Sequence, residues 1–279
     1  VQVRTAGRVA SIPLEEYVLG SVLAEVSPGD QTPATAARIL EVQAIMARTY
    51  AAAGLGRHRA DGFDLCDTTH CQRYDPARIK TSRFAAAARE AVRRTSGRII
   101  TYGQRPVEAL FHADCGGYTS ASETVWGGRA RPYLLAEPDK LASDPHRKWR
   151  IAVPADRLRA ALNADTATAV GRRLDGIRVV SRDVGGHATT LALSGEHAHT
   201  IRGEQLRSIL NVTLGDRAVQ STRLTVTRTN STYVFEGTGF GHGVGLCQVG
   251  AAARARRGDS VDAIIAHYFP GATLSAARR

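Results

Sequence analysis

The chain of 279 residues contains little lysine, few aromatic residues and no long hydrophobic run. Lysine occurs only as Lys80, Lys140 and Lys148, so arginine carries nearly all of the positive charge. Aromatic residues make up 6% of the sequence and no known nucleic-acid-binding motif is present, which argues against a nucleic-acid-binding protein. No stretch of about 18 apolar residues occurs, so we expect no transmembrane segment in this chain.

The charge and the first residues bear on where the protein works. A net charge of +11 suits polyanionic surroundings such as nucleic acid, an anionic membrane surface or an anionic cell-wall polymer. The sequence begins Val1-Gln2-Val3-Arg4, without an initiator methionine or a signal peptide. Such a start is expected of a mature chain whose targeting segment has been removed, and the first residues alone do not fix the compartment. With 43% hydrophobic residues, the chain can bury a core as one large domain or two small ones.

A helix is predicted over residues 14–26, with a glutamate at its C-terminal end. Leu14, Val18 and Val22 form an apolar stripe at four-residue steps. Glu25 continues this stripe immediately before the helix ends. A carboxyl group there has two interpretations. It is either a buried acid paired with an arginine or a general acid whose pKa is raised by desolvation, as glycan-cleaving enzymes require.

A second helix is predicted over residues 34–53 and a third over residues 82–95. Thr32 is the expected N-cap of the second helix, and Gly54 closes it. Gln43 and Tyr50 share one face of this helix, where the polar Gln43 interrupts an apolar stripe. Gln43 is therefore either a satisfied core amide or an amide of a binding site.

Two cysteines and a histidine lie within six residues, at Cys66, His70 and Cys71. Their thiolates and imidazole suit three of the four positions around a tetrahedral zinc ion. A Cys66–Cys71 disulfide in an oxidising compartment and plain buried thiols are the alternatives. The remaining cysteines, Cys115 and Cys247, would each add a ligand or half of a disulfide.

A β-hairpin is predicted from a strand at 98–102 and a partner strand at 107–112. It leads into a segment with His112, Asp114, Cys115, paired glycines and Tyr118. These residue types at the exit of a strand suit a binding site, since glycine lets the backbone approach a ligand. Residues 120–149 are expected to be irregular, with aromatic side chains that anchor the loop on the core rather than stack on sugar rings.

Short strands and turns predict a mainly β lobe after residue 150. The expected strands cover residues 176–181, 188–193, 197–202, 223–229 and 232–237, and the expected helices cover residues 155–162 and 203–210. Its histidines, His187, His197 and His199, are expected to be exposed strand residues rather than metal ligands.

The last motif is a loop with six glycines between Gly237 and Gly250 and with His242 at its centre. It is not a dinucleotide-binding fingerprint, which requires an early βαβ unit with an acidic residue about 20 positions further on. We interpret it as backbone packed closely around a cleft into which His242 projects. Helices are predicted at 251–257 and 262–268.

Six motifs together resemble the SpoIID/LytB family, which includes a sporulation peptidoglycan enzyme and an amidase enhancer. They are LEEYVLGSVLAEV, QAIMARTY, CDTTHCQRY, FHADCGGYT with VWG, GTGFGHGVGLCQVGA and HYFPGATL, in family order over nearly the whole chain. The resemblance implies an extracytoplasmic protein that acts on the peptidoglycan of the bacterial cell wall. Characterised enzymes of the family are lytic transglycosylases, which cleave the MurNAc–GlcNAc β-1,4 bond of strands stripped of stem peptides and leave 1,6-anhydroMurNAc ends.

The resemblance also implies roles for individual residues. Glu25 matches the catalytic glutamate, and Cys66, His70 and Cys71 match a region that carries zinc in part of the family; we expect that zinc to be structural. Candidates for lining the substrate cleft are Gln43, Tyr50, His112, Tyr118 and His242. The expected partners are peptidoglycan glycan strands and other wall hydrolases such as an amidase, without nucleic acid.

The expected architecture is α+β, as a single catalytic domain over residues 1–279. Its helical and loop part covers about 1–150, its β-rich lobe about 151–236, and the glycine-rich cleft loop with C-terminal helices 237–279, with the cleft between the helical part and the lobe. Three other functions compete with the lytic transglycosylase: a non-catalytic peptidoglycan-binding module that enhances an amidase, a hydrolase that uses zinc at Cys66, His70 and Cys71, and a basic nucleic-acid binder.

Overall fold

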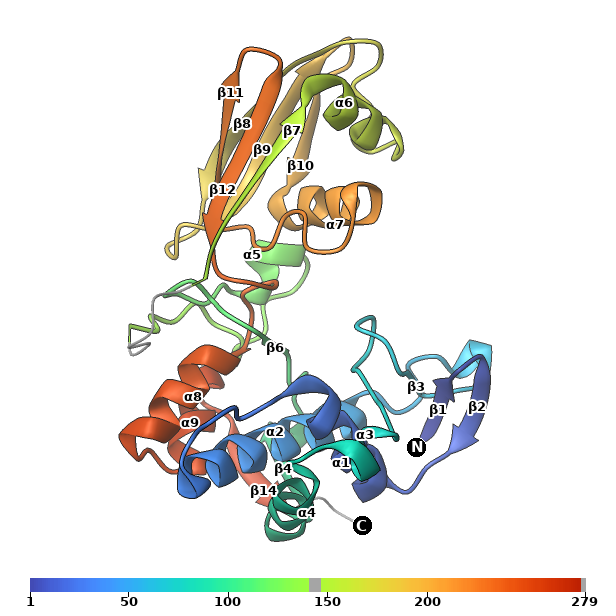
Figure 1. The fold of residues 1–279 in the computed structure, drawn as a ribbon, viewed down its shortest axis with the longest axis vertical. Helices are drawn as coiled ribbons and strands as arrows, with labels where there is room; N and C mark the ends of the chain where they lie inside the picture. The colour runs from blue at the N-terminus through green and yellow to red at the C-terminus, as the bar shows by residue number, and fades with distance from the viewer. Residues whose placement is uncertain (141–146, 277–279) are drawn as a thin grey trace. The chain divides into compact units, whose positions relative to one another are not determined.

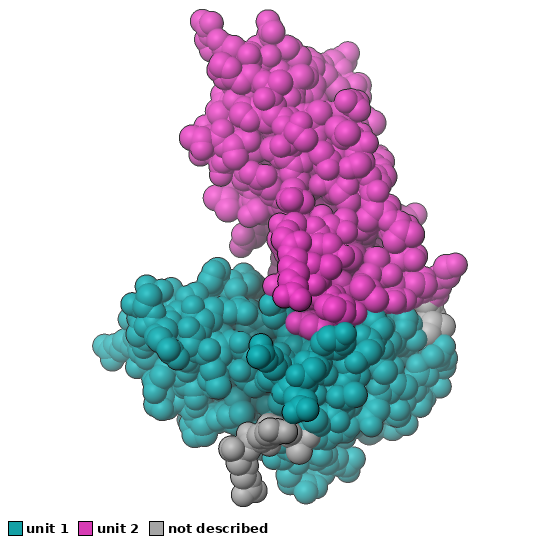
Figure 2. Space-filling model, turned by 180° about the vertical axis from the view of Figure 1, so that it is seen from behind, with its two compact units in different colours: residues 1–110, 251–279 teal, residues 111–250 magenta. Residues whose placement is uncertain are grey.

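The computed structural model describes residues 1–140 and 147–276 (Figure 1). The chain divides into two compact units, coloured separately in Figure 2. Unit 1 comprises residues 1–110 and 251–279, and unit 2 comprises residues 111–250. Both units combine helices with small sheets, so the predicted α+β class is confirmed.

The chain leaves unit 1 after residue 110, well before the boundary near residue 150 that the sequence suggested. The reason is that the segment after residue 110 pairs with the glycine-rich loop. Strand β6 (Phe111–His112) runs parallel to β13 (Leu246–Cys247), and the backbones of Asp114 and Phe240 bond each other in both directions. Both partners of each pair therefore belong to unit 2.

The three helices predicted for the first hundred residues are all present in unit 1. They are α1 (Leu14–Glu25), α2 (Pro33–Ala53) and α4 (Ala85–Arg94), and a short α3 (Arg78–Thr81) precedes α4. The side chain of Thr32 caps α2 by accepting a hydrogen bond from the Thr35 N–H, as expected. Helix α1 is buried on every side from Tyr17 to Ala24, so its apolar stripe is wider than the sequence indicated.

A buried arginine ties these helices together. Arg48, on α2, has a side chain with no exposed surface and forms a two-pronged ion pair with Glu15 of α1. Its remaining N–H groups reach the main-chain carbonyls of Ala44, Val92 and Arg98. The guanidinium thus satisfies acceptors from α1, α2, α4 and the start of β4 (Arg98–Tyr102).

The sheets of unit 1 join distant parts of the chain. Strand β1 (Gln2–Thr5) lies between β2 (Arg8–Ser11) and β3 (Leu65–Cys66), and β4 lies between β14 (Thr273–Ala276) and β5 (Arg105–Pro106). The predicted hairpin partner of β4 at residues 107–112 is wrong. A tight turn with Gly103 and Gln104 both at positive φ brings Arg105–Pro106 back onto β4 instead.

Helices α8 (Gln248–Arg257) and α9 (Val261–Tyr268) precede β14, and η1 (Arg59–Asp61) lies between α2 and β3. The N-cap of α9 is Ser260, whose hydroxyl accepts from the Ala263 N–H. No helix among the described residues is long and apolar enough to cross a membrane.

Unit 2 contains the predicted β-rich lobe. One sheet has the order β10-β9-β8 and another the order β11-β12-β7. Their bounds are Lys148–Pro154 for β7, Leu174–Arg182 for β8, Ala188–Gly195 for β9, His199–Arg202 for β10, Leu224–Thr229 for β11 and Thr232–Thr238 for β12. Helices α5 (Ser122–Trp126), α6 (Ala155–Asn163) and α7 (Gly203–Leu214) complete the unit.

The two tryptophans of the predicted irregular region differ in burial. Trp149 is buried on β7, where its indole N–H donates to the hydroxyl of Ser221. Trp126 is 43% exposed and lies against the ring of His242, with 5.2 Å between the ring centroids. Trp149 therefore anchors the core as expected, whereas Trp126 keeps part of its face open to solvent.

Candidate active site and metal centre

Glu25 is the last residue of α1 and is half-buried, as the sequence predicted for a carboxyl at the end of the helix. Its Oε1 accepts a 2.6 Å hydrogen bond from the backbone N–H of Arg73. Burial raises the pKa of Glu25 above its usual value, although the hydrogen bond and charge of Arg73 oppose this shift. A carboxyl group with a raised pKa is suited to act as a general acid.

The packing of α1 explains how Arg73 reaches Glu25. The ring of Tyr74 stacks on that of Tyr17 with 5.3 Å between centroids, and it lies directly over Gly20. A Cβ atom added at Gly20 would come within 2.4 Å of the Tyr74 ring. The absence of a side chain at Gly20 therefore allows the segment carrying Arg73 to pack against α1.

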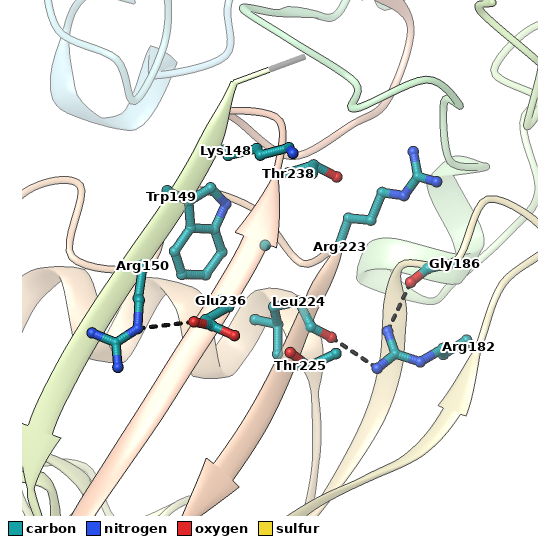
Figure 3. Close-up of a pocket in the computed structure, with 11 residues that line it drawn as sticks. Lys148, Trp149, Arg150, Arg182, Gly186, Arg223, Leu224, Thr225, Glu236 and Thr238 are labelled. Atoms are coloured by element: carbon teal, nitrogen blue, oxygen red, sulfur yellow. Dashed lines mark hydrogen bonds and ion pairs between the residues drawn. The ribbon is translucent and has the colours of Figure 1, made fainter. Parts of the chain in front are cut away.

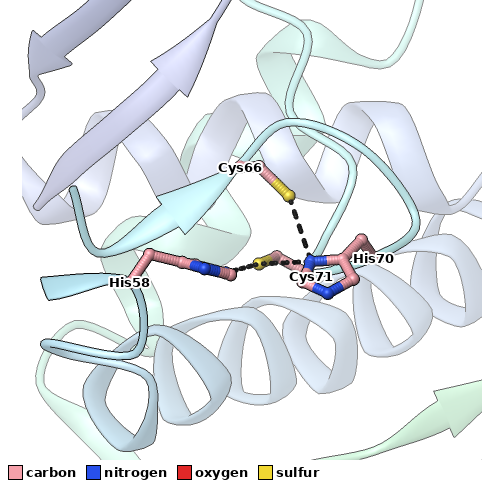
Figure 4. A group of neighbouring side chains, drawn as sticks. All are labelled: His58, Cys66, His70 and Cys71. Atoms are coloured by element: carbon pink, nitrogen blue, oxygen red, sulfur yellow. Dashed lines mark hydrogen bonds between the residues drawn. The ribbon is translucent and has the colours of Figure 1, made fainter. Parts of the chain in front are cut away.

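Four side chains that can ligate a metal converge just before this segment (Figure 4). They are the predicted Cys66, His70 and Cys71, together with His58, and their donor atoms all lie within 4.8 Å of one another. Nδ1 of His70 lies 3.6 Å from Sγ of Cys66 and 3.7 Å from Sγ of Cys71. Nε2 of His58 lies 3.2 Å from Sγ of Cys71.

The donor set fits a tetrahedral zinc ion. Bond lengths of about 2.0–2.3 Å place neighbouring ligand atoms of such a site about 3.3–3.8 Å apart, and the three separations lie within this range or about 0.1 Å below it. The other ring nitrogen of His58 faces Asp61 at 3.8 Å, as expected for a metal-bound imidazole oriented by a carboxylate. Burial acts to raise the pKa of Cys66, but hydrogen bonds from Thr68 and Cys71 outweigh this effect and lower the pKa to about 6.

His58 is the site residue that the sequence analysis missed. It lies eight positions before Cys66, outside the short motif. An antiparallel bridge between His58 and Phe63 folds the chain back, and the two rings stack with 4.6 Å between centroids. A search for one further histidine within ten residues of the motif would have identified it.

The two predicted polar residues of α2 are buried, and Tyr50 lies near this cluster. Tyr50 is 5% exposed, and the guanidinium of Arg57 donates a hydrogen bond to its hydroxyl and lies over its ring. Arg57 also interacts with Cys71. Gln43 is 2% exposed, which favours the core-amide interpretation of this residue. Neither residue presents its side chain to solvent.

Gln72 is a second residue that the sequence analysis did not single out. It lies between Cys71 and Arg73, is 2% exposed, and has no hydrogen-bond partner for either end of its amide among the described residues. Buried amides are normally satisfied. Gln72 therefore offers a donor and an acceptor next to the segment that binds Glu25.

The other predicted site residues belong to unit 2. His112 is buried, and its Nδ1 bonds the carbonyl of Val244. His242 is half-buried, accepts from the Val244 N–H, and lies 5.5 Å from His112 between ring centroids. Burial and the neighbouring charges lower the pKa of His242 well below its usual value. His242 with the exposed Trp126 beside it thus offers a neutral, partly open aromatic surface.

Tyr118 takes part in the backbone of unit 2. Its carbonyl oxygen faces Nε2 of His187 at 3.0 Å, while Nδ1 of His187 bonds the hydroxyl of Thr222. His187 is therefore a buried structural residue and not the exposed strand residue predicted. Its burial lowers its pKa. His199 is half-buried and bonds the carbonyl of Ala169, and His197 is exposed as predicted. That the unit 2 residues share a cleft with Glu25 stays a prediction.

Unit 2 also carries a basic pocket of about 550 Å³ that none of the predicted site residues lines (Figure 3). Arg182 is fixed by the carbonyls of Gly186 and Leu224, and Arg150 is paired with Glu236. Its other basic residues are Lys148 and Arg223. This set of cations suits a ligand with an acidic group.

Comparisons with known proteins agree with the motifs. Residues 2–102 match the model of a family described as stage II sporulation protein, and residues 142–245 match a domain of unknown function. The chain is 33% identical to stage II sporulation protein D of Bacillus subtilis, over 98% of this chain and 78% of that protein. It is 30% identical to stage II sporulation protein D of Bacillus amyloliquefaciens, over 96% of this chain and 76% of that protein.

A protein of another name is also similar. The amidase enhancer of Bacillus subtilis is 26% identical over 90% of this chain, but the chain spans only 40% of its length. The match to stage II sporulation protein D extends across both units and contains the Glu25 helix, the Cys/His loop and the glycine-rich loop. The chain belongs to the SpoIID family.

Proposed function

We propose that this protein is a peptidoglycan lytic transglycosylase in which Glu25 is the general acid and base. The observation that carries the proposal is the environment of Glu25: a half-buried carboxyl with a raised pKa at the open end of a helix, held by a backbone N–H. Family membership and the similarity to an amidase enhancer support a role at the cell wall.

A single carboxyl group is sufficient for this reaction. Protonated Glu25 donates its proton to the oxygen of the leaving GlcNAc as the glycosidic bond breaks. The resulting carboxylate takes the proton of the MurNAc 6-hydroxyl, whose oxygen bonds the anomeric carbon of the same sugar. The product is a 1,6-anhydroMurNAc end, and Glu25 is protonated again. Most glycosidases need a second carboxyl to activate water or to form a glycosyl-enzyme.

The nucleophile is already part of the substrate. Well-oriented intramolecular groups act at effective concentrations on the order of 10⁵ M or more. The protein therefore needs mainly to orient the sugar and to supply one proton at a pKa near the working pH. The pKa of Glu25 is shifted upward, in the direction that the second requirement demands.

We propose that His58, Cys66, His70 and Cys71 hold a structural zinc ion. Four protein ligands leave no coordination position for water or substrate, whereas catalytic zinc sites keep one open. The bound ion would fix the loop from Cys66 to Tyr74. The ligands would affect the reaction indirectly, because the loop that they fix carries the Arg73 N–H that donates a hydrogen bond to Glu25.

The test is mass spectrometry of the products from denuded glycan strands. Three proteins are compared: the wild type, Glu25→Gln, and Glu16→Gln as a control that changes an exposed acid on the same helix. We expect anhydroMurNAc ends from the wild type and the control and none from Glu25→Gln. Reducing MurNAc ends from the wild type would contradict the proposal, because they require attack by water.

A non-catalytic function is the second candidate, favoured by the similarity to an amidase enhancer. Such a module would bind peptidoglycan and stimulate a partner amidase without forming any sugar product. In that case Glu25→Gln would bind and stimulate as the wild type does. Metal-loaded, folded wild type that releases no product from denuded or peptide-bearing strands would favour this function.

A further inference from the structure

A second group of possible metal ligands lies in unit 2, where two members follow Cys71 by 41 and 44 positions and the third by 176. A ring nitrogen of His112 and the sulfur atoms of Cys115 and Cys247 all lie within 4.8 Å of one another. The three residues are 4%, 1% and 0% exposed. We propose that His112, Cys115 and Cys247 bind a thiophilic divalent cation of the zinc type, independently of the proposed activity.

The first argument is the orientation of the imidazole. Nδ1 of His112 bonds the backbone carbonyl of Val244, which makes Nδ1 the protonated nitrogen and leaves a lone pair on Nε2. Nε2 is buried and faces the side chain of Cys247. A metal-bound histidine has this arrangement, with one nitrogen on the ion and the other donating to a carbonyl.

The second argument is the surroundings of the sulfur atoms. Sγ of Cys247 accepts from the N–H groups of Cys115 and Gly250, both at 3.3 Å. Sγ of Cys115 accepts from the N–H of Gly117 at 3.4 Å. Burial raises the pKa of the Cys247 thiol well above its usual value, but hydrogen bonds donated to sulfur favour the thiolate, which is the form that binds metal. Backbone N–H groups thus donate to both sulfur atoms.

Charge balance is consistent with a divalent ion. In the metal-free protein, the thiol of Cys115 donates to Oδ2 of the fully buried Asp139 at 3.7 Å. Binding of one M²⁺ releases the protons of both thiols, and the two thiolates neutralise the ion. Asp139 then lies beside the ligands as a nearby oxygen donor.

A disulfide between the two cysteines is the competing arrangement. It would remove both thiols but leave Nε2 of His112 buried and unsatisfied, and an unsatisfied buried polar atom costs about 1–3 kcal/mol. A bound ion satisfies this nitrogen and both sulfur atoms at once. A metal ion therefore provides a bonding partner for all three buried groups, whereas a disulfide provides one only for the two sulfur atoms.

The location suggests what the ion does. Cys115 lies just after β6 and Cys247 ends β13, so the ligands join the first and last segments of unit 2, which are separated by 132 residues. Closing so long a loop by a cross-link restricts the unfolded chain strongly. The proposed ion is therefore a structural cross-link of unit 2.

The experiment uses the full chain with the first cluster disabled by Cys66→Ser and Cys71→Ser. After reduction, loading with Zn²⁺ and desalting, we expect a single zinc equivalent per chain, and with Co²⁺ a thiolate-to-cobalt charge-transfer band. Adding Cys115→Ser and Cys247→Ser should abolish both signals. His112→Gln should weaken zinc binding at least about tenfold, whereas His187→Gln, at another buried histidine of unit 2, should not.

Circular dichroism first establishes that each variant is folded. If the Cys115/Cys247 variant does not fold, His112→Gln decides the question, because it retains both thiols. Two results would overturn the proposal. One is a folded, reduced Cys66/Cys71 variant that retains no zinc and gives no cobalt band. The other is a Cys115–Cys247 disulfide, found by peptide mass spectrometry in protein prepared with zinc present.

Discussion

The backbone N–H of Arg73 and the carboxylate of Glu25 are joined by a 2.6 Å hydrogen bond. Arg73 follows Cys71 by two positions, and the N–H of Tyr74 bonds the carbonyl of Asp67, which closes the loop between them. The ligands of the proposed zinc ion and the proposed catalytic acid are therefore linked by a short stretch of backbone. Disorder in the loop would be transmitted directly to Glu25.

This link predicts how the protein responds to loss of metal. A chelator, or His58→Ala, should lower both the melting temperature and the rate of product formation, because the loop no longer holds the Arg73 N–H in place. At free zinc about 100 times the dissociation constant, binding contributes about 2.7 kcal/mol to stability. His197→Ala, at an exposed histidine of unit 2, is the control. An unchanged rate after complete removal of zinc would contradict the link.

The raised pKa of Glu25 predicts a pH dependence of activity. The general acid must be protonated, so the rate should decrease as pH rises through the raised pKa of Glu25. A pH–rate profile of anhydroMurNAc release measures this. If the midpoint of the alkaline decrease in rate lies at or below pH 4.5, the usual pKa of glutamate, the direction of the shift is contradicted.

The same shift predicts an effect on stability. The folded protein binds the Glu25 proton more tightly than the unfolded chain does, so this proton stabilises the fold. The stabilisation is fully present below the pKa that Glu25 has in the unfolded chain, and it is lost as pH rises through the pKa that Glu25 has in the folded protein. Glu25→Gln, a neutral replacement, should therefore melt higher than the wild type at neutral pH. The difference should shrink on acidification. Glu16→Gln, at an exposed site, should not show this trend.

Gly20 is predicted to be intolerant of a methyl group. Alanine normally stabilises a helix interior by about 1 kcal/mol relative to glycine. Here its Cβ would meet the Tyr74 ring at 2.4 Å, so Gly20→Ala should destabilise the protein and lower its activity. Combining it with Tyr74→Leu should recover part of the stability, since the smaller side chain relieves the overlap. Chemical denaturation of the single and double variants measures both effects.

Replacing Arg48 is predicted to destabilise the protein more than replacing its ion-pair partner Glu15. Arg48→Ala removes a buried guanidinium that donates to main-chain carbonyls of three segments, at a cost of about 3 kcal/mol. The Glu15 side chain is 41% exposed, so solvent screens its charge and Glu15→Gln should cost less than about 1 kcal/mol. Equal effects in urea denaturation would show that the ion pair itself, rather than the buried carbonyls, accounts for the cost of losing Arg48.

Local signals in the sequence predicted most helices and strands. Thr32 and Gly54 bounded α2 correctly, and the glutamate at the end of α1 was recognised from a four-residue repeat. Pairings between distant segments could not be predicted in this way. The contact of β6 with β13 depends on residues far apart in the chain, and neither strand has more than two residues.

The candidate site shows the same limit. The Cys/His loop was visible because its residues are adjacent, whereas His58 enters it only through the turn that pairs with Phe63. Cys115 and Cys247 were noted separately, but nothing local in the sequence indicated that His112 and both sulfur atoms meet. The burial of His187 depends on Tyr118 and Thr222, which lie on other segments.

The division of unit 1 into two stretches of chain has a consequence for synthesis on the ribosome. Strand β4 pairs with β5 as soon as both emerge, but its other edge stays open until β14 is made. All of unit 2 is synthesised in the interval and, being continuous, has its own core available first. The nascent chain therefore carries an unpaired strand edge while unit 2 is being completed, and open edges of this kind are sites of aggregation.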